Sequence, residues 1–118
     1  MSLKNNGKTP LISPMRVIQL VEDEYGVKIT DYTRKVKIIY PRYQCIYLLR
    51  KYCNLSLKSI CEYVPITDHS TIIKALRRNQ YLIDNNFDYF ISLKKLDDEI
   101  AEYTNYKTIG KNNILSSY

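Results

Sequence analysis

Asp68, His69, Ser70 and Thr71 are the residues of this 118-residue chain whose types and spacing could do chemistry. They place the only histidine beside a carboxylate and two hydroxyls, the groups that a Ser-His-Asp hydrolase uses. Such a triad needs hydrogen bonds from Ser to His to Asp, whereas neighbouring helical residues point about 100° apart. Adjacent positions therefore cannot form the relay, and the sequence has neither a GxSxG elbow nor a phosphate-binding glycine loop. We expect no catalytic residues and no enzyme activity.

Cys45, Cys53 and Cys61 recur every eight residues, and His69 continues the spacing. This series suggests a zinc site, but eight helical residues rise about 12 Å, whereas zinc ligands lie about 2.0 to 2.3 Å from the metal. The alternative is that the cysteines are small, reduced residues packed in the interior, which an odd count of thiols without an export signal favours. We therefore predict neither a metal site nor a cofactor.

The positive charge of the chain is concentrated in its middle third. The first 33 residues are formally neutral and the last 39 carry −2, whereas residues 34–79 carry +8. The basic residues of this segment are Arg34, Lys35, Lys37, Arg42, Arg50, Lys51, Lys58, Lys74, Arg77 and Arg78. Charge segregated in this way indicates contact with a polyanion, most commonly nucleic acid, and the alternative is a solvated basic face.

The elements that must position these residues belong to one globular domain. We predict that it spans residues 13–103, between a disordered tail over 1–12 and a mobile tail over 104–118. No apolar run reaches the roughly 18 residues that cross a bilayer, and the N-terminus lacks a signal peptide. We expect no membrane contact and a cytoplasmic location.

Helical periodicity dominates the domain. Ser13 and Pro14 begin a first helix that Gly26 ends, and Pro41 opens a second long helix. The intervening segment holds at most a short turn, although "KVKIIY" could pair briefly as a strand. The second helix faces inward through Cys45, Ile46, Leu48, Leu49, Tyr52 and Cys53.

A helix-turn-helix is predicted near the centre. Ser56 caps a helix over 57–64 that Pro65 ends, and Asp68 caps a helix from His69 to about Asn85. A final helix follows over 87–103. The inward residues of these last two helices are expected to be Ile72, Ile73, Leu76, Gln80 and Ile83, then Phe90, Leu93, Leu96 and Ile100. The fold class is therefore an all-α bundle with a central helix-turn-helix.

The stretch "CNLSLKSICEYVPITDHSTIIKALRR" resembles the C-terminal DNA-binding domain of DnaA, the bacterial replication initiator family. The resemblance runs from about Ser13 to Ile100 and includes the Pro41-Arg42 pair. It implies a Trp-repressor-like helical bundle that binds double-stranded DNA as a monomer. The target implied is an A/T-rich site of the DnaA-box type, and the process is replication initiation or its regulation.

The resemblance also implies roles for individual residues. Asp68, His69, Ser70 and Thr71 would read bases in the major groove, and Arg34 would enter the minor groove. The DNA backbone would be met by Arg42, Arg50, Leu57 and Lys58. Helical spacing places Lys74, Arg77 and Arg78 on the exposed side of their helix, opposite the inward residues, where helix-turn-helix geometry favours further phosphate contacts. Arg42 and Arg50 could instead pair with surface carboxylates, and Leu57 could be part of the core.

The chain departs from the family pattern at several positions. Before the Asp68–Thr71 motif, family members usually carry two glycines and a basic residue, where this chain has Pro65, Ile66 and Thr67. Within the motif, Ser70 stands in place of the family threonine. We therefore expect an altered base preference. A chain of 118 residues leaves no room for the ATPase of DnaA, which suggests either a stand-alone module or an excised fragment. An alternative is a protein-interaction module that binds a replication protein through this surface, which Pro65-Ile66 and the tyrosines at 40 and 43 suggest.

Overall fold

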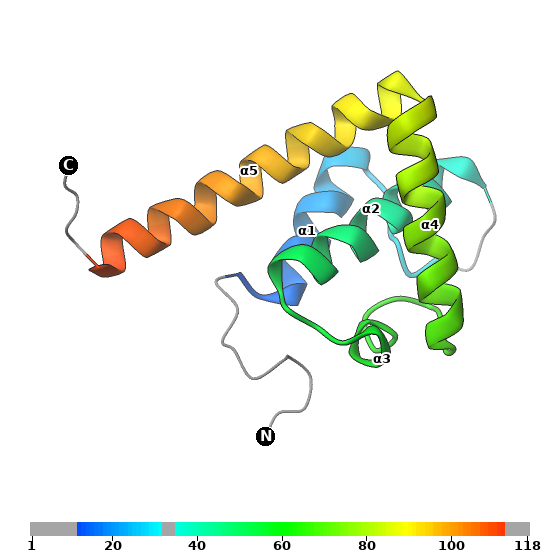
Figure 1. Ribbon diagram of the computed structural model, residues 1–118, viewed down its shortest axis with the longest axis horizontal. Coiled ribbons are helices and arrows are strands. Elements are labelled where there is room, and N and C mark those ends of the chain that lie inside the picture. Colours follow the sequence, from blue (N-terminus) through cyan, green and yellow to red (C-terminus); the bar gives the residue numbers. More distant parts are fainter. Residues whose placement is uncertain (1–11, 32–34, 113–118) are drawn as a thin grey trace.

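The computed structural model describes residues 12–31 and 35–112, and the side chains among them as far as Asn105. Its helices are α1 (Pro14–Tyr25), α2 (Val36–Tyr52), α3 (Leu57–Ile60), α4 (His69–Asn85) and α5 (Phe87–Asn112). The described residues contain no strand, so the predicted all-α fold is confirmed. Figure 1 shows α3 beside the first turn of α4, at the opposite end of α4 from its corner with α5.

Local capping signals determine where α1 and α4 begin. The Ser13 hydroxyl accepts from the backbone N–H of Arg16 at 3.2 Å, and Pro14 occupies the first helical position of α1. Gly26 ends α1 at a φ of 66°, a left-handed conformation that favours glycine. Asp68 caps α4. The predicted bounds of α1 and α4 are therefore confirmed.

The prediction for the start of α2 is wrong. The helix begins at Val36, so "KVKIIY" is almost wholly helical and Pro41 lies inside α2 rather than opening it. A proline there removes the helical donor to the carbonyl of Lys37, which is unfavourable. Ile38 and Pro41 are both buried at i, i+3 spacing, and this burial outweighs the local signal.

Two other helix ends also differ from the prediction. α3 stops at Ile60, because the N–H groups of Cys61, Glu62 and Tyr63 donate to carbonyls three residues back and tighten the chain into turns. α5 continues to Asn112 instead of ending at Tyr103, and Figure 1 shows its far end extending beyond the other helices. Within the segment assigned as a tail, Thr104 is buried and its hydroxyl donates to the carbonyl of Ala101 at 3.0 Å.

The core lies between α2 and the helices around it. Cys45 and Cys53 are fully buried, as predicted, and Cys61 is half-buried. The inward face of α4 is formed by Ile72, Ala75, Asn79 and Leu82, and that of α5 includes Tyr89, Leu93, Leu96 and Ile100.

Gln80 and Phe90 were wrongly assigned to the core. Both side chains are exposed, whereas their neighbours Asn79 and Tyr89 are 1% and 4% exposed. The Tyr89 hydroxyl donates to the amide oxygen of Asn79 inside the protein. This pairing satisfies two buried polar groups, so both helices turn these polar residues inward.

Candidate nucleic-acid interface

The connection between α3 and α4 fixes the first turn of α4 at the protein surface. Val64 is buried, Ile66 packs against the core, and the Ile66 N–H donates to the carbonyl of Val64 at 2.7 Å. From Thr67 onward the chain turns outward, and every side chain from Thr67 to Thr71 is exposed. The turn therefore presents the start of α4 to solvent while Ile72 packs beneath it.

Asp68 holds the start of α4 through its carboxylate. Its Oδ1 accepts from the backbone N–H of Ser70 at 3.0 Å, and its carbonyl accepts from the N–H of Thr71 at 2.9 Å. Hydrogen bonds from the backbone and hydroxyl of Ser70 hold the pKa of the Asp68 carboxyl below its ordinary value. Asp68 is thus a helix cap, which the residue type predicts, in addition to any contact it makes outside the chain.

Three cations follow along the exposed side of α4. Lys74, Arg77 and Arg78 are all exposed, and none of them forms an ion pair with an acidic residue in the described part of the chain. The guanidinium of Arg78 lies 5.2 Å from the ring centroid of Tyr81, one turn further along. This cation–π contact restricts where Arg78 points. Tyr81 was missed from the sequence, although its i, i+3 spacing from Arg78 is the signal for it.

The short helix α3 adds a further cation to this surface. Lys58 is exposed, whereas Leu57 is half-buried and packs against the core. Ser56 caps α3, since its hydroxyl oxygen accepts from the Ser59 N–H at 3.1 Å. Lys58, Lys74, Arg77 and Arg78, together with the exposed residues 67–71, are called the α3–α4 surface below.

Two of the predicted arginines point toward the chain itself. Arg42 donates from Nε to the carbonyl of Ile29 at 2.8 Å and from a terminal nitrogen to the carbonyl of Asp31. Arg50 donates from a terminal nitrogen to the carbonyl of Leu55 at 2.7 Å. In each of these three contacts the acceptor is a backbone carbonyl. Arg34 lies outside the described residues.

Lys51, another cation of the basic segment, is turned away from the α3–α4 surface. Its ammonium lies 2.7 Å from a carboxylate oxygen of Asp97 on α5, and the Tyr52 hydroxyl donates to the same carboxylate. Burial and this carboxylate raise the pKa of Tyr52 to about 12. In a second pair between helices, the ammonium of Lys95 lies 3.0 Å from a carboxylate oxygen of Glu24 and joins α5 to α1. Asp97 and Glu24 therefore each pair with a cation of another helix.

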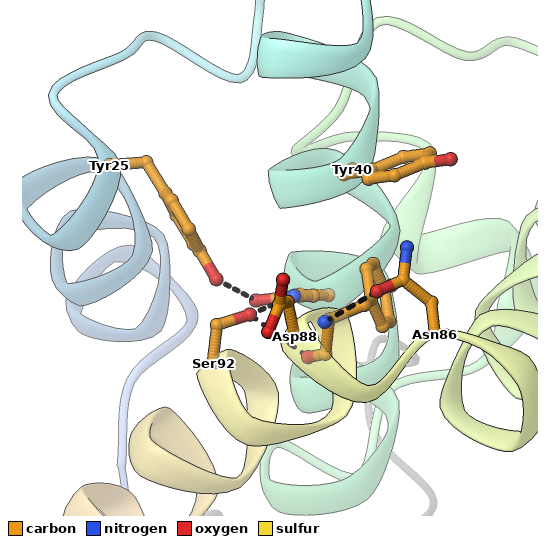
Figure 2. A pocket seen from close by; sticks show the side chains of 7 residues that line it. Tyr25, Tyr40, Asn86, Asp88 and Ser92 are labelled. Atoms are coloured by element: carbon orange, nitrogen blue, oxygen red, sulfur yellow. Dashed lines mark hydrogen bonds between the residues drawn. The ribbon is translucent and has the colours of Figure 1, made fainter.

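A polar pocket of about 270 Å³ lies where α1, α2 and α5 meet, and Figure 2 shows its lining. The Tyr25 hydroxyl donates to the side-chain oxygen of Gln44 at 2.6 Å, and the Gln44 amide donates to Ser92 at 3.1 Å. Ser92 in turn donates to the carbonyl of Tyr89 at 2.9 Å. This chain of bonds satisfies the buried Gln44 and links α1, α2 and α5.

The described part of the chain contains neither a cluster of metal ligands nor a membrane-spanning helix. No group of three or more His, Cys, Asp or Glu side chains there is arranged to hold a metal ion. None of its helices is both long and apolar enough to span a membrane.

Comparison with known proteins gives a consistent set of relatives. Residues 14–78 match the family described as the bacterial dnaA protein helix-turn-helix. Chromosomal replication initiator protein DnaA of Thermus thermophilus is 30% identical over 76 residues, which cover 62% of this chain and 17% of that protein. The same protein of Bdellovibrio bacteriovorus is 30% identical over 96 residues, with coverages of 79% and 20%. That of Gloeobacter violaceus is 35% identical over 80 residues, with coverages of 58% and 18%. The chain spans about a fifth of the length of these curated relatives.

Proposed function

Because this chain belongs to the family of bacterial DnaA helix-turn-helix domains, we propose that it binds double-stranded DNA through the α3–α4 surface. The observation that carries the proposal is the exposed run from Asp68 to Thr71 at the start of a helix whose other side is buried. In a helix-turn-helix protein, the first residues of the second helix enter the major groove and meet base edges. The short polar groups of His69, Ser70 and Thr71 have the donors and acceptors for that task.

The cations of the α3–α4 surface are proposed to bind phosphates. Lys58 on α3 and Lys74, Arg77 and Arg78 on α4 are exposed, so their charge is available to an external anion. Leu57 is proposed to approach the DNA backbone beside Lys58. Arg34 is proposed for the minor groove on the basis of the family resemblance. Arg42 and Arg50, whose guanidinium groups donate to backbone carbonyls, are assigned no phosphate of their own.

The proposed role is that of a sequence-selective module in replication initiation or its regulation. It is supported by the relatives, which are named as replication initiator proteins. Ser70 lacks the methyl group of the family threonine, so its preference at one base step should differ from that of the family. We propose that the module binds as a monomer to an A/T-rich site of the DnaA-box type.

Fluorescence anisotropy tests this proposal directly. The full chain is titrated against a duplex with a DnaA-type box and against a scrambled duplex, at several salt concentrations. Each neutralised phosphate contributes about −0.9 to the slope of log affinity against log salt, so four or five cations predict a slope of about −4. Tighter binding to the box supports selective recognition. Equal binding to both duplexes leaves only a non-selective DNA binder, and no binding at low salt overturns the proposal.

The protein-interaction alternative depends on aromatic side chains that the fold partly buries. Tyr40 and Tyr43 are half-buried and stacked, with ring centroids 6.3 Å apart, and Tyr40 packs edge-on against Tyr89 at 5.4 Å. Aromatic groups used inside the protein are less available to a partner. A pull-down with a replication protein that succeeds without DNA, and fails for a Tyr43→Ala variant that remains folded, would favour this alternative.

A further inference from the structure

The connection between α2 and α3 is short and conformationally restricted. Asn54 has a φ of 57°, a left-handed conformation that costs energy for a residue other than glycine. The next residue, Leu55, is 3% exposed and buries its side chain in the core. Ser56 then caps α3. The chain must therefore leave α2 and enter α3 along one defined path.

The side chain of Arg50 restrains the backbone of this connection. It lies in the last turn of α2, and its terminal nitrogen Nη1 donates to the carbonyl of Leu55 at 2.7 Å. The Leu55 residue is thus fixed at two points, by its buried side chain and by its bonded carbonyl. Since Ser56 follows directly, the contact sets the direction in which the chain enters α3.

The position of α3 matters because this helix is too short to be stable alone. It spans only Leu57–Ile60, and an isolated helix of one turn does not form in water. Its placement therefore depends on its contacts with α2 and α4. Lys58 is its exposed cation, so whatever moves α3 also moves Lys58 relative to a bound duplex.

We propose that Arg50 is a positioning residue that places Lys58 for contact with a DNA phosphate. This inference rests on the proposed function, and it departs from the direct phosphate contact that the family resemblance implies for Arg50. The guanidinium suits the task because its fixed, planar donors hold a carbonyl in a defined direction. Arg50 and Lys58 then act as one unit in DNA binding.

A double-mutant cycle on the full chain separates positioning from direct contact. Arg50→Met, Lys58→Ala and the double variant are titrated with a labelled duplex of random sequence at several salt concentrations. If Arg50 acts through Lys58, the slope of log affinity against log salt becomes less negative by about 0.9 in each single variant and by the same amount in the double variant. If Arg50 binds its own phosphate, the slope of the double variant becomes less negative by about 1.8, and the proposal is overturned.

Lys74→Ala is the matched control, because it removes one exposed charge on a different helix. Its effect should add to that of Lys58→Ala. A Lys74→Ala effect that also fails to add would mean that the cycle does not report specific coupling, and this would count against the proposal.

Hydrogen exchange without DNA provides a readout that is independent of the proposed function. Ile60 donates to the carbonyl of Ser56 at 3.1 Å, and Cys61 donates to that of Lys58 at 3.2 Å. Arg50→Met should speed exchange of these two amides by about three- to ten-fold, whereas Lys74→Ala should leave them unchanged. Unchanged exchange in Arg50→Met overturns the positioning role. If the unmodified chain binds no duplex, the proposed function fails, and this exchange measurement still decides whether Arg50 positions α3.

Discussion

The guanidinium Nε of Arg42 donates a 2.8 Å hydrogen bond to the carbonyl of Ile29, and thereby joins α2 to the segment that follows α1. A terminal nitrogen of the same guanidinium donates a second hydrogen bond to the carbonyl of Asp31. A half-buried arginine used in this way stabilises the fold, whatever else it contacts.

Arg42→Ala should lower the free energy of unfolding by about 1 to 2 kcal/mol, because two carbonyls lose a charged donor. Arg42→Lys should recover only part of this loss, since a single ammonium does not reproduce the planar fork. Urea denaturation followed by circular dichroism measures both. Arg77→Ala, at an exposed position of α4, is the control and should stay within about 0.5 kcal/mol of the unmodified protein. Equal losses for Arg42→Ala and Arg77→Ala would contradict the assignment.

His69→Ala should weaken binding to the preferred duplex by about five- to 150-fold and binding to scrambled DNA little, because His69 is proposed to meet base edges. Lys74→Ala should weaken binding to both duplexes equally, because a phosphate contact carries no sequence information, and should make the slope of log affinity against log salt less negative by about 0.9. Anisotropy titrations of the two variants in parallel test the assignments. Identical behaviour of His69→Ala on both duplexes would remove the base-reading role.

Asp68→Ala should lower the melting temperature near neutral pH, since it removes the cap of α4. The hydrogen bonds from Ser70 lower the folded-state pKa of Asp68, so its ionised form stabilises the folded state. That contribution is complete above the unfolded-state pKa of about 3.8 and is lost as the pH falls through the lower folded-state pKa. Thermal unfolding of both proteins from pH 7 to pH 2 should show the difference shrinking only at the acidic end. A difference that changes most between pH 5 and pH 7 would require another titrating group.

Tyr89→Phe should destabilise the protein by about 1 to 3 kcal/mol, because it leaves the buried amide oxygen of Asn79 without its donor. Tyr81→Phe also removes a tyrosine hydroxyl, but from an exposed position on α4, so it should change the free energy of unfolding little. Chemical denaturation compares the two variants. If both lose the same stability, the bond between Tyr89 and Asn79 does not hold α4 against α5.

Much of the candidate site followed from the sequence because its signals are local. Ser13 and Asp68 each bond to an N–H two or three residues away, so their residue types alone predict where α1 and α4 begin. The exposed run from Asp68 to Thr71 follows from that start together with the apolar residues behind it. The cations of α4 were predicted on its exposed side for the same reason.

The tertiary structure alone decided what the other arginines contact and how the helices are rotated. Arg42 and Arg50 find their acceptors on segments outside their own helix, where residue type gives no direction. α2 extends through Pro41, and Asn79 turns inward to meet Tyr89, because burial against other helices outweighs the local preference. The starts of α1 and α4 could therefore be predicted from the sequence, because they depend on hydrogen bonds between residues close in the chain. Which polar groups remain available at the surface was decided by packing between segments that are distant in the chain.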